Sequence, residues 1–208
     1  MLKQERKKEL ANFVKTLNLD VSDFEILNLA LTHGSYNPAS RKTFTNNERL
    51  EFFGDAVLKL FISEYLMSKY NNFSEGELSK VRAYVVSEKV LAKIADKLQI
   101  KKYILMGKNE GKNPPLSILA DSVEALLAVV YYECGAEKTR NFILENWELY
   151  IDSSAIVIDT DNYKAVLQEH LQANKSGLPI YKTISESGPD HLKQFEVGVY
   201  LNTVFLCY

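Results

Sequence analysis

The chain has 208 residues, of which 46% are hydrophobic and 25% are charged, and this composition suits a soluble globular protein with one domain and a small second one. The charged N-terminus lacks the apolar core of a secretory signal, and no run of about 20 uncharged apolar residues predicts a membrane span. The net charge of −2 argues only weakly against a nucleic-acid binder, because clustered acidic residues can cancel a basic face. Two distant cysteines, Cys134 and Cys207, suit free thiols in a reducing compartment, so we expect a cytoplasmic protein without membrane contact.

Residues 1–150 are predicted to form an all-α domain. Apolar residues recur there at spacings of three and four, which is the period of a helix with one buried face. Clusters of turn residues separate the predicted helices at 32–38, 70–77 and 106–115. In the second cluster, Ser74 and Glu77 have the spacing of a capping box, which predicts that a helix begins there.

The pattern changes after residue 150. We interpret residues 151–160 as a linker and residues 161–208 as a small α+β domain. Helical spacing over 162–173 is followed by three segments with the alternation typical of strands: 180–186, 195–201 and 203–208. The sequence therefore predicts one helix followed by a three-stranded antiparallel sheet.

The stretch NNERLEFFGDAVLKL, residues 46–60, places acidic residues on a helix that is otherwise largely apolar. Glu51 and Asp55 are four residues apart, so a helix brings them to one face, where their like charges repel. Gly54 inside the helix costs about 0.5–1 kcal/mol relative to alanine, and its presence indicates close backbone packing. A solvated acidic face is the alternative reading of this pair.

A second acidic pair, Asp121 and Glu124, lies three residues apart on a predicted helix that must be mostly buried. Burying an unpaired carboxylate costs several kcal/mol, so these groups must be protonated, paired with cations or bound to a metal. If this helix packs against the first, four carboxylates converge on an oxygen-only site that favours Mg²⁺ or Mn²⁺ over Zn²⁺. A salt-bridge network with arginines such as Arg49 or Arg82 is the alternative.

The segment NERLEFFGDAVL, residues 47–58, resembles the signature of the ribonuclease III family. Three further blocks resemble that family's blocks in the same order: ALTHGSY (30–36), EGELSKVRAYVV (75–86) and SILADSVEALLAVVY (117–131). Residues 161–208 resemble a double-stranded-RNA-binding domain, with YKAVLQEHLQ (163–172) and GPDHLKQFEV (188–197) at the expected places. The resemblance implies an all-α endonuclease domain followed by a small α+β domain that is incomplete at its C-terminus, without the final helix.

The resemblance also implies roles for individual side chains. It assigns metal binding to Glu51, Asp55, Asp121 and Glu124, with Asp55 and Glu124 as catalytic residues. Glu48 and Glu75 match further acidic positions near the cleft or the subunit interface, and we expect them to have supporting roles. The family is homodimeric, and Phe52 is a candidate for the aromatic side chain that inserts into the partner subunit; ordinary core packing is the alternative.

The implied activity is endonucleolytic hydrolysis of phosphodiester bonds in double-stranded RNA, with Mg²⁺ as cofactor and Mn²⁺ as a substitute. One metal would activate a water molecule while a second, about 3.5–4 Å away, would stabilise the leaving 3′-oxygen. The products would carry 5′-phosphate and 3′-hydroxyl ends, and precursors of ribosomal RNA are among the substrates implied. The alternatives are a non-catalytic double-stranded-RNA-binding or ribosome-associated relative and a helical hydrolase of small phosphate esters.

The second domain would recognise the shape of an A-form duplex through 2′-hydroxyls and phosphates. By position in the motif, Gln168, Glu169 and Gln172 would face one minor groove and His191 the next, although a solvated helix face could also explain the two glutamines. Residues 161–208 hold four lysines against five acidic residues, so this part of the chain offers few cations for phosphate contacts.

Overall fold

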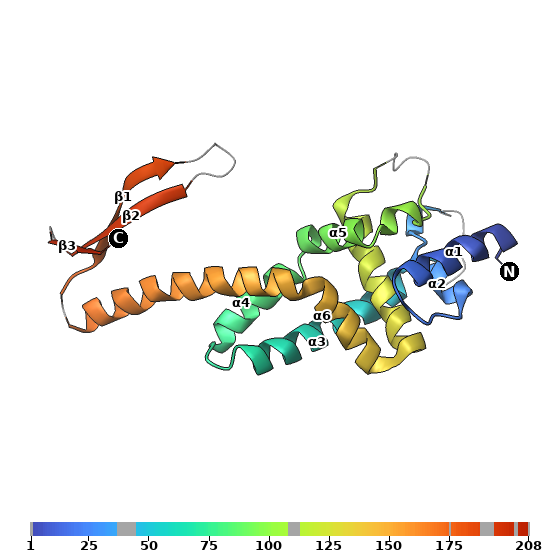
Figure 1. The fold of residues 1–208 in the computed structure, drawn as a ribbon, viewed down its shortest axis with the longest axis horizontal. Coiled ribbons are helices and arrows are strands. Elements are labelled where there is room, and N and C mark those ends of the chain that lie inside the picture. Colours follow the sequence, from blue (N-terminus) through green and yellow to red (C-terminus); the bar gives the residue numbers. More distant parts are fainter. Residues whose placement is uncertain are drawn as a thin grey trace. The chain divides into compact units, whose positions relative to one another are not determined.

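A computed structural model describes residues 2–36, 45–107, 113–174, 176–187, 194–201 and 204–207. The chain divides into two units, Met1–Ala155 and Ile156–Tyr208. The first unit and the start of the second are helical, and the strands that the structure describes lie in the second unit (Figure 1). The prediction of an all-α domain followed by a small α+β domain is confirmed.

The first unit is built from helices joined by short turns. In chain order the elements are α1 (Gln4–Thr16), α2 (Phe24–Ala30), the 3-10 turn η1 (Gly34–Tyr36), α3 (Glu48–Lys69), α4 (Glu75–Val85), α5 (Glu88–Lys97), the 3-10 turn η2 (Ile100–Lys102) and α6 (Leu116–Ala173). The capping box predicted at Ser74 and Glu77 is present at the start of α4. Such a cap satisfies backbone N–H groups that the first turn of a helix leaves without partners.

Helix α6 is interrupted at Gly135, where the backbone has φ 80° and ψ 173° (Figure 1). Glycine adopts this positive φ at little cost, so the chain changes direction there and then resumes its helix. The second part of α6 continues through residues 151–160, so the segment interpreted as a linker is helical. The boundary between the two units falls inside this segment, after Ala155.

The first part of α6 forms the centre of the core of the first unit. Its fully buried side chains include Ala125, Leu126, Leu127, Val129 and Val130. Beyond the break, Trp147 is also fully buried, and its indole N–H donates to the carbonyl oxygen of Val85 at 3.1 Å. Because the one polar atom of Trp147 has a partner, the residue adds a large apolar surface to the core without an unsatisfied donor.

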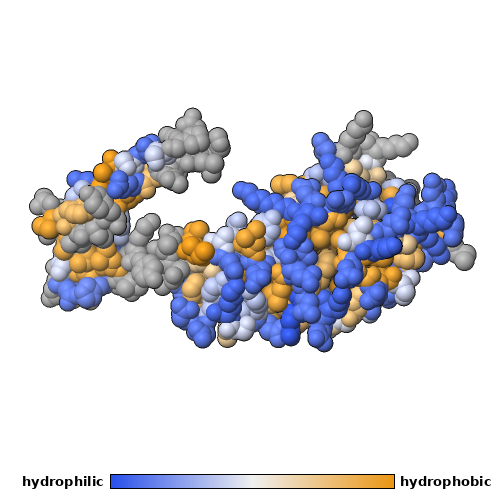
Figure 2. Space-filling model, in the orientation of Figure 1, coloured by the Kyte–Doolittle hydropathy of each residue, from blue (hydrophilic) through white to orange (hydrophobic). Residues whose placement is uncertain are grey.

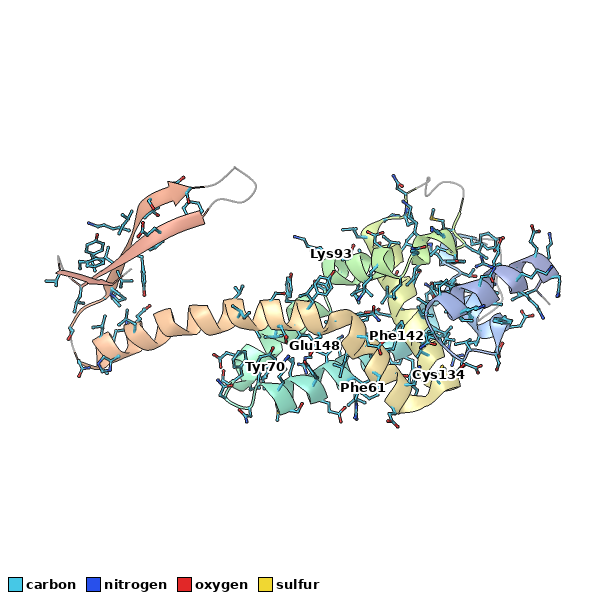
Figure 3. The ribbon with its side chains drawn as sticks, in the orientation of Figure 1. Phe61, Tyr70, Lys93, Cys134, Phe142 and Glu148 are labelled. Carbon is cyan, nitrogen blue, oxygen red and sulfur yellow. The ribbon has the colours of Figure 1, made fainter. Side chains whose placement is uncertain are left out.

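Polar contacts tie the end of α3 to the second part of α6. Lys69 Nζ lies 2.8 Å from Asp152 Oδ1 and 3.5 Å from Glu148 Oε1. The hydroxyl of Tyr70 also donates to Asp152, at 2.7 Å. Figure 3 labels Tyr70 and Glu148 in this region. It also labels Cys134, which is a free thiol, as the sequence predicted.

Helices α3 and α6 cross with their backbones in close contact at Gly54. A Cβ atom added at this position would overlap the carbonyl group of Glu124. The close packing that the sequence predicted for Gly54 is therefore confirmed. The crossing fixes the distance between the two helices that carry the acidic pairs.

The second unit contains a three-stranded antiparallel sheet in the order β1 (Pro179–Ser187), β2 (Gln194–Leu201) and β3 (Val204–Cys207). Tyr181 pairs with Val199, and the register shifts between Thr183 and Ser185. The three predicted strands and their order are confirmed. The sheet keeps several apolar side chains exposed, among them Ile180, Ile184, Phe195 and Val204.

Hydrophilic residues cover much of the visible face of the first unit, with apolar residues between them (Figure 2). Among the residues that the structure describes, no helix combines the length and the apolar character that crossing a membrane requires.

The helix crossing yields a prediction for stability. Gly54→Ala should lower the free energy of unfolding by about 2–4 kcal/mol, because the new methyl group meets backbone rather than a side chain that can move aside. Urea unfolding followed by circular dichroism measures this change. Gly76→Ala is the matched control: a Cβ there meets nothing within 4 Å, so the helical propensity of alanine should stabilise α4 by about 0.5–1 kcal/mol. Equal effects of the two substitutions would contradict the close crossing.

Candidate metal centre

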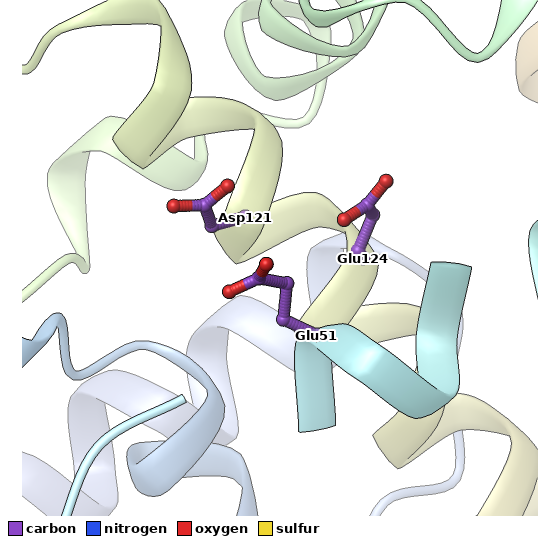
Figure 4. Close-up of side chains that lie close together, drawn as sticks. All are labelled: Glu51, Asp121 and Glu124. Atoms are coloured by element: carbon purple, nitrogen blue, oxygen red, sulfur yellow. The ribbon is translucent and has the colours of Figure 1, made fainter. Parts of the chain in front are cut away.

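Three carboxylates from two helices converge beside the α3–α6 crossing. Glu51 comes from α3, and Asp121 and Glu124 come from α6; one oxygen of each lies within 4.8 Å of the others. Figure 4 shows the three side chains, with the two from α6 on one side and Glu51 on the other. All three are partly buried. Because residues three apart share a helix face, the crossing places Asp121 and Glu124 together opposite Glu51.

The carboxylates are held where negative charge is unfavourable. Burial, followed by repulsion from Asp55, Glu51 and Asp121, raises the pKa of Glu124 to about 8. Burial is also the main cause of the raised pKa of Glu51, to which Asp121, Glu48 and Asp55 add repulsion. Burial raises the pKa of Asp121 as well. A bound cation would relieve the repulsion in this cluster, and the all-oxygen donor set suits a hard divalent ion.

Asp55 is the predicted ligand that stands slightly apart. It lies one turn after Glu51 on α3, and its charge raises the pKa of Glu124. Its Oδ2 atom, however, accepts a hydrogen bond from Lys59 Nζ at 2.7 Å, and it does not belong to the close group of three. The sequence analysis missed Lys59, although its i,i+4 spacing from Asp55 is a known signal for an ion pair.

The two supporting acidic residues lie in different surroundings. Glu48 is the exposed first residue of α3, and its charge contributes to the raised pKa of Glu51. Glu75 is the exposed first residue of α4 and accepts a hydrogen bond from Ser79 Oγ at 2.8 Å. Glu75 is not part of the three-carboxylate group.

His33 acts on the site in a way that the sequence analysis missed. A protonated His33 ring opposes the rise in the pKa of Asp121, whereas the neutral ring is the form that can accept at Nδ1. The ring is oriented by Ser35, whose backbone N–H donates to His33 Nδ1 at 3.2 Å and whose Oγ lies 2.8 Å from the same atom. Gly107 N–H donates in turn to Ser35 Oγ at 2.9 Å. A hydrogen bond therefore connects the turn that contains His33 to the segment that follows η2.

The other predicted site residues lie outside this cluster. Phe52 is 80% exposed, which excludes the alternative that it packs in the core of its own subunit. Gln168 and Gln172 are exposed on α6. The side chain of Glu169 and the whole of His191 lie outside the described residues. Arg82, considered as a counter-charge for the carboxylates, donates to Ser63 Oγ at 2.9 Å.

Comparisons with known proteins agree with the two-unit organisation. Residues 23–149 match the family model described as ribonuclease-III-like, and residues 163–207 match the double-stranded RNA binding motif. Ribonuclease 3 of Borreliella burgdorferi is 41% identical over 206 residues, which cover 97% of this chain and 84% of that protein. Ribonuclease 3 of a Nitratiruptor species is 44% identical over 202 residues, which cover 94% of this chain and 85% of that protein.

Solved structures give the same relationship for the first unit. A nuclease domain of ribonuclease III from Campylobacter jejuni, described as having structural flexibility in a region involved in dimer formation, is 40% identical with a TM-score of 0.58. The match covers 65% of this chain and 96% of that one. A second structure of this nuclease domain is 38% identical, again with a TM-score of 0.58, and covers 74% of this chain and 96% of that one.

The raised pKa of Glu124 predicts that the metal-free protein loses stability as the pH rises. Between its ordinary value of 4.5 and about 8, the folded state holds a proton on Glu124 that the unfolded state has released. The associated stability is fully present below pH 4.5 and is lost as the pH rises through 8. In EDTA, Glu124→Gln should therefore raise the free energy of unfolding at pH 8 by roughly 1–3 kcal/mol and change it little at pH 4.5.

Urea unfolding at the two pH values measures this difference. Glu137→Gln, an exposed change on α6 beyond the break at Gly135, is the control and should show no such dependence. A gain from Glu124→Gln that is equal at both pH values would contradict a carboxyl group held protonated by its surroundings.

Proposed function

The chain belongs to the ribonuclease III family, and we propose that it is an endoribonuclease that hydrolyses the phosphodiester bonds of double-stranded RNA with divalent metal ions. The observation that carries this proposal is the convergence of three carboxylates, Glu51, Asp121 and Glu124, from two helices that also contribute much of the apolar core. A carboxylate cluster of this kind destabilises the protein unless it binds a cation. Products with 5′-phosphate and 3′-hydroxyl ends follow from attack by water with departure of the 3′-oxygen.

Four carboxylates would hold the metal: Glu51, Asp55, Asp121 and Glu124. The donor set fits Mg²⁺, with Mn²⁺ as a substitute, because every ligand atom is a carboxylate oxygen. When bound, the metal would lower the pKa of water and stabilise the charge that develops on the leaving oxygen. Asp55 and Glu124 are the residues to which we assign catalytic roles. Glu48 adds negative charge at the edge of the site, which favours capture of a cation.

The second unit would hold the RNA duplex. It matches the double-stranded RNA binding motif, and the exposed Gln168 and Gln172 can both donate and accept hydrogen bonds. We propose that these residues, together with Glu169 and His191, contact 2′-hydroxyls and phosphates across the minor grooves. Such contacts read the shape of the duplex rather than its sequence. Processing of ribosomal RNA precursors and other structured RNAs in the cytoplasm is the role that we propose for this activity.

We also propose that the enzyme is a homodimer in which Phe52 inserts into the partner subunit. Phe52, at the start of α3, has 80% of its surface exposed, so its ring is available for contact with a second subunit. The first unit also has a cavity of about 220 Å³ between α3 and α4, lined by the apolar residues Leu66, Met67 and Leu78 together with Ser63, Glu75, Ser79 and Arg82. This cavity can receive an aromatic ring. Glu75 at its edge would then act at the subunit interface.

Cleavage of an RNA duplex tests the role of Glu124. Glu124→Gln should reduce Mg²⁺-dependent cleavage of a labelled RNA duplex by roughly a hundredfold or more, because loss of groups that only orient a ligand already costs about 10–100-fold. Binding of the duplex in a gel-shift assay with EDTA should survive. Glu137→Gln is the control and should cleave normally. Undiminished cleavage by Glu124→Gln would refute its role as a metal ligand, and cleavage of equal rate in EDTA would refute the metal dependence.

Self-association of the protein tests the role of Phe52. Phe52→Ala should weaken self-association by about 10–100-fold, because a buried aromatic anchor at an interface typically contributes that much. Sedimentation velocity over a range of protein concentrations measures the change. Leu149→Ala removes another exposed apolar side chain, from α6, and should leave the association unchanged. A dimer of unaltered affinity in Phe52→Ala would show that Phe52 does not make the interface.

A further inference from the structure

Lys59 places an ammonium group at the edge of the acidic cluster. Its Nζ atom lies 2.7 Å from Asp55 Oδ2, and the two side chains are 49% and 34% exposed. The two residues are four apart on α3, with the acid on the N-terminal side, which is the favourable order for an ion pair on a helix. The lysine therefore supplies positive charge where the proposed function places a metal ion.

The ion pair with Lys59 makes Asp55 differ from the other three carboxylates of the metal-free site. It gives Asp55 a partner, whereas Glu51, Asp121 and Glu124 form the close group without it. The charge of Lys59 also opposes the rise in the pKa of Glu124, so its field reaches α6. Lys59 is thus a counter-ion for carboxylates on both helices.

The ion pair between Lys59 and Asp55 opposes the binding of a divalent ion. A cation held by the four carboxylates would be repelled by the ammonium group and would need the negative charge of Asp55. Both members of the pair are substantially exposed, and exposed i,i+4 pairs are weak. The lysine can therefore be displaced easily, but its presence opposes binding of the metal.

We infer that Lys59 is a built-in competitor of the metal ion for Asp55, which lowers the metal affinity of the RNA-free protein and must leave Asp55 when the metal binds. This inference rests on the proposed function of the same site. Lys59 is a positioning residue in this account, because it acts on the metal through Asp55. A released ammonium group would remain next to the site, where a phosphate of the RNA could replace the carboxylate as its partner.

The test is the affinity of the RNA-free protein for Mn²⁺, measured by electron paramagnetic resonance of the free ion at low ionic strength. Lys59→Gln should bind Mn²⁺ roughly two- to fivefold more tightly than the wild type, which corresponds to the loss of a weak exposed ion pair. Lys59→Arg keeps the charge and the reach, and should restore the wild-type affinity. The advantage of Lys59→Gln should shrink as salt is added, because salt screens an exposed pair.

Lys80→Gln is the matched control, since it removes one exposed lysine from α4 and changes the total charge equally. Its Mn²⁺ affinity should equal that of the wild type. Equal or weaker binding by Lys59→Gln would overturn the inference, as would equal tightening by Lys80→Gln. Thermal unfolding of each variant establishes that it is folded. If the wild type itself fails to bind Mn²⁺, the proposed metal site is wrong, whereas wild-type binding that Lys59→Gln leaves unaltered refutes only the role of Lys59.

Discussion

The close approach of α3 and α6 at Gly54 is the constraint on which the rest of the first unit depends. The backbone of α3 meets the carbonyl group of Glu124 at a point where any side chain would interfere. Glu51 lies one turn before this contact and Asp55 directly follows it, so both flank the crossing. On α6, Glu124 is at the contact and Asp121 is one turn earlier. A wider separation of the helices would part the two acidic pairs, and therefore the glycine sets the width of the acidic cluster.

The acidic cluster is a local source of instability that the core has to offset. Burial and mutual repulsion make ionisation of Glu124 unfavourable, as its pKa of about 8 shows. The same helix contributes fully buried apolar residues to the core, including Leu126 and Leu127. A functional site that lowers stability is common in enzymes, and here one helix carries both the destabilising acids and a run of stabilising apolar residues. A bound cation would supply the missing charge and remove the conflict.

Much of this organisation could be predicted from the sequence, because it follows from local spacing. The i,i+3 and i,i+4 acidic pairs, the glycine among bulky residues and the alternating strands each carry their own signal. The helical state of residues 151–160 could not be predicted in this way. Serine, aspartate and β-branched residues there have modest helix propensities, and the segment is helical as a continuation of α6. Apolar periodicity does not say which of two neighbouring phenylalanines faces the solvent, so it left the exposure of Phe52 open, and only the family resemblance singled this residue out.

Properties that depend on the meeting of distant segments were the hardest to predict. The influence of His33 on Asp121 requires the turn after α2 to lie beside α6, and no spacing along the chain encodes that contact. The same limit applies to the charges that would attract a phosphate backbone. Residues 161–208 contain only four of the 25 lysines and arginines, although neutralisation of phosphates normally dominates affinity for a duplex. Residues 1–160 hold the other 21 lysines and arginines against 22 acidic residues, so neither part of the given sequence has a cationic excess, and the placement of the charges on the surface rather than their sum decides where a phosphate is attracted.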